Sequence, residues 1–298
     1  MNLAEPTLAI LLTGALVGVS AALLGSFLVL RGNSMLADAI SHSILFGIAL
    51  AWLLTGQTSG PIQIVGAALS GVLAVFLIET LTRTRRLRDD ASIGLVFPAL
   101  FSIGVLLINV FARDVHLDEH TVLLGEIGFV WLETVELGGL VVPRPTLAMA
   151  VMLLLDAVFV LAFYKSLKLA TFDPDLARAL GLAPALIFYA HLSLLSGTAV
   201  AAFDAVGVVL FVPFVVVPPA SALLLTRRLS SMILLAMLFA AASAPIGYGF
   251  AVWLDVSIGG AMALATGGFL APAYAWRRWR RRRQRHSPGR QSAPSASA

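Results

Sequence analysis

The chain contains no cysteine, and only two of its residues are lysine. The absence of cysteine excludes disulfides, covalent haem attachment and thiolate metal ligands, so that a metal would have to be bound by His, Asp, Glu, Met or backbone oxygen. Neither Lys165 nor Lys168 lies in a G-x-x-x-x-G-K-[ST] sequence, the phosphate-binding loop of many ATPases. If ATP drives this protein, another subunit hydrolyses it, and we expect the chain itself not to be an enzyme.

Charged residues are also scarce, at 12% of 298 residues, which is about half of their share in soluble domains. Hydrophobic residues make up 59% of the chain, and the mean hydropathy is +0.94. Apolar runs near 20 residues, the length that crosses a bilayer as a helix, predict an all-α, polytopic membrane helix bundle. The N-terminal segment has Glu5 and no basic residue before its apolar run. It therefore predicts a retained first span and not a cleaved signal peptide.

The apolar runs predict eight or nine transmembrane helices within one transmembrane domain, residues 1–276. All basic residues except Arg113 and Arg144 fall on one side of this arrangement. The positive-inside rule makes that side cytoplasmic, with the N-terminus outside, the C-terminus inside and the protein in the plasma membrane. The expected spans are 8–30, 34–54, 62–81, 91–111, 145–167, 184–202, 205–225, 231–253 and 258–275.

Two segments fall outside the pattern of clear spans. Residues 112–144 mix acidic and histidine side chains with apolar ones, which predicts a helix in the outer interface or a re-entrant piece. Within it, His116, Asp118 and His120 could meet an incoming cation, although a solvated loop is the simpler interpretation. Residues 277–298 predict a basic, disordered cytoplasmic tail that contacts lipid headgroups, with no nucleic acid as partner.

The segment 38–47, DAISHSILFG, places an acid and a histidine inside a predicted span. Asp38 and His42 are four residues apart, so their side chains project from the same face of a helix. Ionisable groups within a membrane are costly and usually line a path for an ion or substrate. A carboxylate and an imidazole are also suitable ligands for a divalent transition metal. A structural polar pair between packed helices is the alternative interpretation of this motif alone.

Two further polar residues interrupt predicted spans. Asp156 lies in the middle of the fifth span, so it must face the protein interior and find a partner. His191, in the sixth span, is better interpreted as forming a hydrogen bond between helices than as a metal ligand. We assign neither residue a role from the sequence.

A short helix is predicted on the cytoplasmic side, at residues 173–181. Asp173 is a favourable N-cap, Pro174 suits the first helical position, and Asp175 complements the positive end of the helix. Gly181 is a suitable stop. So short a helix is not stable alone and needs a partner surface, either the chain's own spans or a separate protein.

Three stretches together resemble the permease subunits of ABC importers for manganese, zinc and iron. Residues 30–54 are similar to that family's signature of a basic residue followed by D-A-[IL]-S-H-[AS]-V-L-P-G. Residues 86–108 resemble its E-D-A-x-I-G-[IL]-x-F segment, and 172–229 resemble F-D-P-E-x-A-x-x-x-G followed by V-G and Pro-Ala-x-x-A. Phe46 departs from the pattern because it occupies the usual proline position, which predicts a weaker kink after His42.

The resemblance implies a homodimeric permease that associates with a separate ATPase subunit and receives cation from an extracytoplasmic binding protein. Asp38 and His42 would contact the metal (Mn, Zn or Fe), and no cofactor would be bound permanently. The contact with the ATPase would be made by the short cytoplasmic helix, through Asp173, Pro174, Asp175, Ala177, Arg178 and Gly181.

Other functions stay open on the sequence alone. The same architecture could carry a different cargo, such as a larger metal chelate. A self-contained carrier could instead use Asp38, His42 and Asp156 as a proton relay. A membrane scaffold without transport leaves the Asp38 and His42 pair unexplained.

Overall fold

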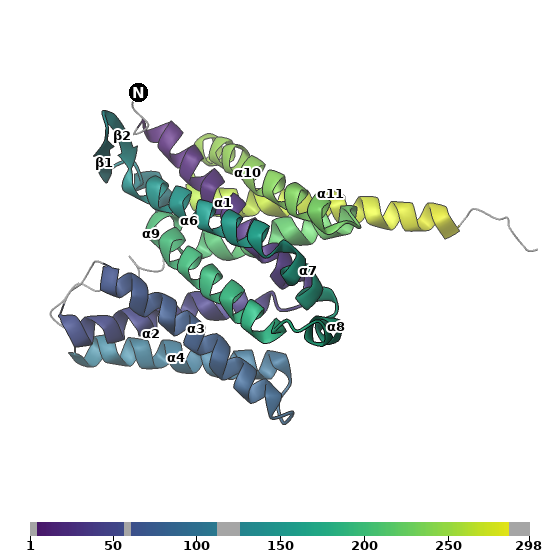
Figure 1. The fold of residues 1–298 in the computed structure, drawn as a ribbon. Coiled ribbons are helices and arrows are strands. Elements are labelled where there is room, and N and C mark those ends of the chain that lie inside the picture. Colours follow the sequence, from purple (N-terminus) through teal and green to yellow (C-terminus); the bar gives the residue numbers. More distant parts are fainter. Residues whose placement is uncertain (1–4, 57–60, 112–125, 286–298) are drawn as a thin grey trace, which may run out of the picture.

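The computed structural model describes residues 5–56, 61–111 and 126–285. These residues fold into a bundle of long helices with one small β-hairpin at the end where the chain begins (Figure 1). Backbone groups in a bilayer must be hydrogen-bonded within the protein, and helices achieve this within one segment. The helices are α1 (Pro6–Leu30), α2 (Met35–Thr55), α3 (Pro61–Arg83), α4 (Asp89–Phe111), α6 (Arg144–Ala162), α7 (Tyr164–Phe172), α8 (Pro174–Ala179), α9 (Pro184–Leu225), α10 (Leu229–Leu254) and α11 (Ile258–Arg285).

Eight of the described helices are long and apolar enough to cross a membrane. They coincide with eight of the predicted spans to within a few residues, except that the fifth ends at Ala162 and α7 follows a break at Phe163. The remaining predicted span, 205–225, corresponds to the shorter apolar segment Leu210–Leu225, which is the second part of α9. The chain is therefore a multi-pass membrane protein.

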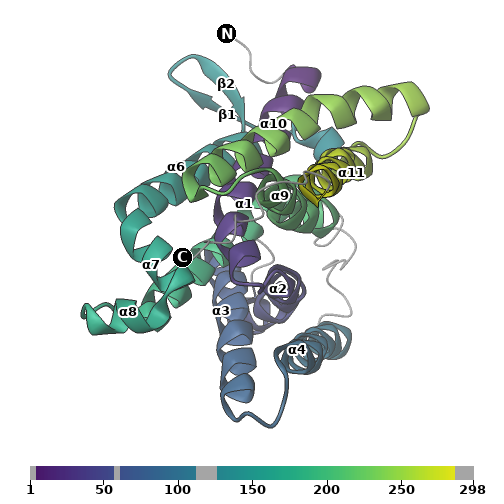
Figure 2. The same ribbon diagram turned by 90° about the vertical axis from the view of Figure 1, so that its right-hand side faces the viewer.

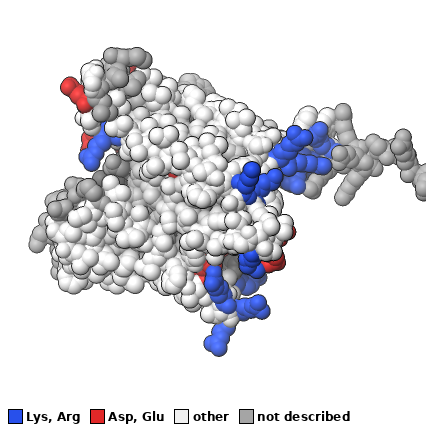
Figure 3. All heavy atoms as spheres, in the orientation of Figure 1, with Lys and Arg blue, Asp and Glu red and all other residues white. Residues whose placement is uncertain are grey.

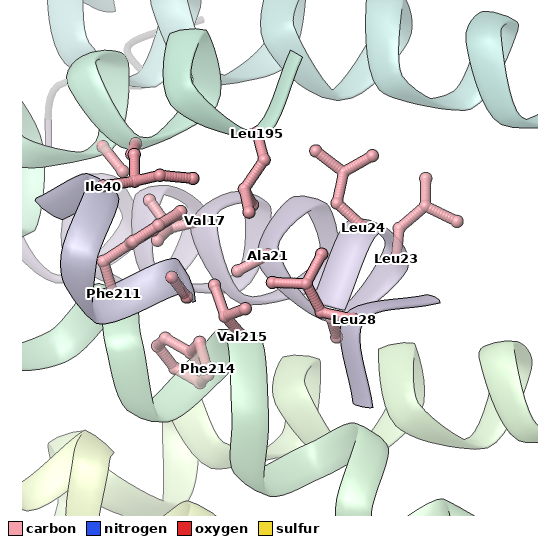
Figure 4. Packing of buried hydrophobic residues seen from close by; sticks show 14 of the residues in the cluster. Val17, Ala21, Leu23, Leu24, Leu28, Ile40, Leu195, Phe211, Phe214 and Val215 are labelled. Atoms are coloured by element: carbon pink, nitrogen blue, oxygen red, sulfur yellow. The ribbon is translucent and has the colours of Figure 1, made fainter. Parts of the chain in front are cut away.

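α1 lies at the centre of the bundle and packs against α6, α9 and α10 (Figure 2). Helix α9 breaks at Gly207, whose φ of 68° and ψ of 174° are open essentially to glycine alone. The break lets the two parts of α9 take different sides of α1. Leu195 lies on one side of α1, and Phe211, Phe214 and Val215 lie on the other (Figure 4).

Helices α2, α3 and α4 form a second group beside this core (Figure 1). α2 packs closely on α3 because Gly47 and Gly66 face each other, and a side chain added to either would clash with the opposite backbone. α2 also packs on α4, where Gly104 lies against the backbone of Phe46. The helix α2 runs without a break through Phe46, as the missing proline predicts.

The segment before α6 corrects one prediction. The composition of residues 112–144 predicts an interfacial or re-entrant helix. Residues 112–125 lie outside the described ranges, and residues 126–143 form a single 3-10 turn, η1 (Ile127–Phe129), and the antiparallel strands β1 (Thr134–Leu137) and β2 (Leu140–Pro143). Gly138 and Gly139 join the strands with φ of 58° and 86°. Two consecutive residues with positive φ make the type of turn that favours a hairpin, so the glycine pair decides the structure.

Charge is distributed unequally between the two ends of the bundle. Basic side chains gather at the end that carries the α3–α4 turn, α7, α8 and the projecting part of α11 (Figure 3). α11 continues to Arg285, nine residues into the segment 277–298 that was expected to be disordered. Arginine is a good helix former, which explains why the helix extends beyond the apolar run.

Candidate functional site

The Asp38 and His42 side chains lie next to each other on α2, as their spacing predicts. The Nε2 atom of His42 is 3.5 Å from Oδ1 of Asp38, and each side chain is 33% exposed. The neighbouring Ser41 and Ser43 are buried, and their hydroxyls donate to backbone carbonyls of α2 itself. The two side chains thus lie together on one face of α2 and are only partly covered by the rest of the chain. A carboxylate oxygen and an imidazole nitrogen, both possible metal ligands, lie close together there.

Two phenylalanines of α4 fix the position of the His42 imidazole. The Phe97 ring is stacked on it, with centroids 5.6 Å apart and planes at 27°. The Phe101 ring meets it edge-on, with centroids 5.9 Å apart and planes at 85°. These contacts were not predicted. In the sequence, Phe97 and Phe101 are four residues apart, as Asp38 and His42 are. This spacing places each pair on one helix face, but it does not show that α2 and α4 are neighbours.

The pair supplies too few ligands to bind a metal by itself. Zinc takes four ligands in structural sites, and manganese favours six oxygen ligands. Among the residues that the structure describes, no group of three or more His, Cys, Asp and Glu side chains could hold a metal ion. The predicted outer residues His116, Asp118 and His120 lie outside the described part of the chain. A metal ion that contacted Asp38 and His42 would therefore need further ligands.

A cavity of about 300 Å³ lies between the start of α2 and the start of α4. It is lined by Met35, one turn before Asp38, and by Asn33, Arg88, Asp90 and Ile93. It is at the basic end of the bundle. A cation that reaches Asp38 from the other end would thus find a polar opening beyond it.

The short helix α8 has the capped form that its sequence predicts. The Asp173 carboxylate accepts a hydrogen bond of 2.9 Å from the backbone N–H of Leu176, and Pro174 occupies the first turn. The Asp175 carboxylate is paired with Arg178 at 2.6 Å. Ala177 is fully buried and anchors the helix, whereas Leu176 is 46% exposed. Gly181 ends the helix with a φ of 78°.

Asp156, on α6, is completely buried and joins three helices. Its carboxyl group contacts the hydroxyl of Ser20 on α1 in a short hydrogen bond, and the hydroxyl of Thr198 on α9 lies 3.1 Å from each of its oxygens. These contacts identify the partners that a carboxyl group in the bundle interior requires. Asp156 lies in another part of the bundle from Asp38 and His42, and the structure does not bring the three into one polar cluster.

His191, on α9, is buried. Neither ring nitrogen makes a hydrogen bond of ordinary geometry in the described ranges, although the backbone of Leu24 on α1 lies close enough to act on the imidazole as a hydrogen-bond partner. The hydrogen bond between helices therefore stays a prediction. The ring also meets the edge of Phe27 on α1, with centroids 5.6 Å apart. The helix interface at this point is aromatic, and the imidazole fills the position of a ring.

One turn toward the basic end, Arg31 lies over the ring of Phe188, with its guanidinium carbon 3.9 Å from the ring centroid. Burial lowers the pKa of Arg31, and the nearby Glu79 carboxylate opposes this effect. Arginine remains charged under such a shift. Arg31, Glu79 and Phe188 line a cavity of about 610 Å³ together with Pro174 and Arg178 of α8. The short helix α8, the end of α1 and the start of α9 thus meet at one cavity.

Comparison with known proteins places these features in context. Residues 4–275 match the family described as "ABC 3 transport family". The "Manganese transport system membrane protein MntD" of Bacillus subtilis (strain 168) is 48% identical over 266 residues, which cover 89% of this chain and 90% of that protein. The "Zinc transport system membrane protein TroD" of Treponema pallidum (strain Nichols) is 45% identical over 268 residues, 90% of this chain and 73% of that protein.

A solved structure has the same fold. It is described as "PsaBC from Streptococcus pneumoniae in complex with Fab". The superposition has a TM-score of 0.73 at 27% sequence identity, and it covers 89% of this chain and 90% of that chain.

Proposed function

The chain belongs to the ABC 3 transport family, and we propose that it is the membrane-spanning subunit of an ATP-driven importer of Mn²⁺, Zn²⁺ or Fe²⁺. The names of its relatives support a metal cargo. The observation that carries the proposal is the pair of Asp38 and His42, which directs a carboxylate and an imidazole to one point of a membrane helix. These two ligand types bind all three cations.

The substrate cation passes this pair without being held as a resident cofactor. A site with few fixed ligands binds weakly enough to release its ion, which conduction requires. Phe97 and Phe101 keep the imidazole in place while the cation exchanges ligands. The cavity beside Met35 and Asp90 then receives the cation on the cytoplasmic side.

ATP is hydrolysed by a separate subunit that docks on α8. The exposed Leu176 and Leu180 give this helix an apolar surface, while its caps fix its orientation. The basic end of the bundle is cytoplasmic by the positive-inside rule, so α8 faces the compartment that holds ATP. An extracytoplasmic binding protein delivers the cation to the opposite end. The His116, Asp118 and His120 side chains are proposed to receive it there.

A second copy of the chain completes the path. Two chains related by a two-fold axis would bring two Asp38 and two His42 side chains together, which gives four ligands where one chain gives two. The one-third exposure of both side chains leaves them accessible to such a partner.

The test is uptake of each of the three cations into vesicles that hold the chain, the ATPase and the binding protein. We expect ATP-dependent accumulation of at least one cation and no accumulation with a catalytically inactive ATPase. Uptake that persists without ATPase and stops when the proton gradient is collapsed would instead show a self-contained carrier. ATP hydrolysis by an assembled complex with no uptake of any of the three cations would show a different cargo, such as a chelate.

A further inference from the structure

Two tight helix joints meet at the cavity between α1, α3, α8 and α9. One joint connects α1 to α2, at residues 31–34, and the other connects α8 to α9, at residues 180–183. The first joint leads within one helical turn to Asp38. The second follows the proposed docking helix. The contact between them thus connects the two proposed functional elements.

The joint between α1 and α2 is closed by hydrogen bonds on both sides. Gly32, with a φ of 74°, donates to Val29 at 3.2 Å, and Asn33 donates to Leu28 at 3.0 Å. This pair of bonds is a Schellman motif, which ends α1. The N–H of Leu36 then donates to the carbonyl of Asn33 at 3.0 Å and begins α2. A displacement of Arg31 is therefore passed to the first turn of α2.

The joint between α8 and α9 is built in the same way. Gly181 donates to Arg178, and Leu182 donates to Ala177, both at 3.0 Å. This is a second Schellman motif. After it, the N–H of Ile187 donates to Ala183 at 3.1 Å in the first turn of α9. Only two residues lie between Gly181 and the start of α9 at Pro184. Because this joint is short and Phe188 lies in the first turns of α9, we expect α8 and Phe188 to move together.

Arg31 and Phe188 connect these joints directly. The guanidinium carbon lies 3.9 Å from the ring centroid, within the range in which a cation is attracted to an aromatic face. The contact between Phe27 and His191 repeats the pairing of α1 with α9 one turn deeper. A planar guanidinium can follow the face of a ring, which an ammonium group does less well.

We propose that Arg31 is a positioning residue that passes movement of the docked α8 helix, through Phe188, to the start of α2 and hence to Asp38 and His42. The proposal rests on the proposed function, because it assumes that α8 receives the ATPase. Arg31 itself contacts neither the cation nor ATP. Its role is to make the arrangement of the metal ligands depend on the state of the ATPase.

The test compares the number of cations transported per ATP hydrolysed in Arg31→Gln, Phe188→Leu and the double variant, all as assembled complexes. We expect each single variant to lower this ratio about tenfold, with ATP hydrolysis within about twofold of the wild type. The double variant should be no worse than either single one, because both remove the same contact. Phe188→Tyr keeps the ring and should restore the ratio.

Trp276→Leu is the matched control, because it removes another arginine–aromatic contact, that of Arg280 over Trp276 at 5.9 Å, far along α11. It should leave the ratio unchanged. A ratio unchanged in Arg31→Gln and Phe188→Leu, or single effects that multiply in the double variant, would overturn the proposal. If Phe188→Leu fails to assemble, Arg31→Gln and Phe188→Tyr decide the outcome.

A second readout separates this proposal from the proposed cargo. Met35 is 56% exposed at the start of α2, and the chain has no cysteine, so within this chain a probe on Met35→Cys reports this site alone. ATP binding by the ATPase should change the probe signal in an otherwise wild-type complex and not in Phe188→Leu. This result is obtained even if none of the three cations is transported. Equal signal changes in both backgrounds would contradict the proposed connection.

Discussion

Asp156 shows how one polar side chain can organise the core of a membrane protein. Ser20, Asp156 and Thr198 come from α1, α6 and α9, and all three are fully buried. The Thr198 hydroxyl also lies 3.0 Å from the carbonyl of Leu194. A buried polar group without a partner is costly. Removal of the carboxyl group leaves the Ser20 hydroxyl without this acceptor, whereas the Thr198 hydroxyl can still donate to the Leu194 carbonyl. The cluster therefore stabilises the packing of α6 on the core.

Asp156→Ala should lower the free energy of unfolding by about 1–3 kcal/mol, because interhelical hydrogen bonds are lost and a cavity is left. Asp156→Asn keeps a side chain of the same shape that can still accept hydrogen bonds, and its loss should be smaller. Unfolding in detergent measures both. The control is Ser193→Ala, which removes an exposed hydroxyl bonded to its own helix. Equal stability of the alanine variant and the wild type would show that the cluster contributes nothing.

At the residue scale, the sequence predicts side chains that share one helix better than those that meet across helices. The contact between Asp38 and His42 follows from a spacing of four residues, and the structure confirms it. The contacts of His42 with Phe97 and Phe101 depend on how α2 packs on α4, which no local pattern contains. His191 shows the same limit, because its aromatic contact with Phe27 on α1 depends on how α9 packs on α1.

At the scale of elements, the sequence predicts a helix boundary well where a residue satisfies a specific backbone requirement, as a cap does. The predicted boundaries of α8 agree with the structure because Asp173 and Gly181 each satisfy a backbone requirement. The mixed composition of residues 112–144 does not indicate the β-hairpin. Its signal in the sequence is the glycine pair Gly138 and Gly139, which forms the turn between the strands. The break after Ala162 was missed as well, since the apolar run continues across it.

The cap of α8 gives a prediction at this scale. Asp173→Ala should destabilise the helix by about 1 kcal/mol. We expect the ATPase to bind the assembled transporter several-fold more weakly as a result, measured by titration of ATPase activity against permease concentration. Asp173→Asn retains the cap without the charge and should bind as the wild type does. Weak binding by both variants would assign the effect to the charge of Asp173.

The break in α9 at Gly207 gives a second prediction at the scale of elements. Gly207→Ala should cost about 1–3 kcal/mol of stability, because its backbone conformation is open essentially to glycine alone. Gly197→Ala in the same helix is the matched control. There the added Cβ would lie 3.5 Å from Met152, an ordinary contact. If the two variants are equally stable in detergent unfolding, the break at Gly207 is not what separates the two parts of α9.

At the scale of the whole molecule, the distribution of charge determines the proposed orientation. The α3–α4 turn carries Arg85 and Arg86 at one end of the bundle, and the β-hairpin with Glu133 and Glu136 lies at the other (Figures 1 and 3). The absence of cysteine allows a direct test. A membrane-impermeant maleimide applied to intact cells should label Thr134→Cys, and it should reach Thr84→Cys only after the membrane is opened. The reverse pattern would invert the orientation and place α8 outside.

Asp38 and His42 are proposed to contact the transported metal, and this role is tested most directly by metal uptake per assembled complex in their near-isosteric variants. Asp38→Asn and His42→Gln should each reduce ATP-dependent uptake at least tenfold with the ATPase still bound. Asp255→Asn makes the same chemical change at an exposed position after α10, where the left-handed backbone suits asparagine, and should transport normally. Uptake at the wild-type level in both Asp38→Asn and His42→Gln would contradict the account.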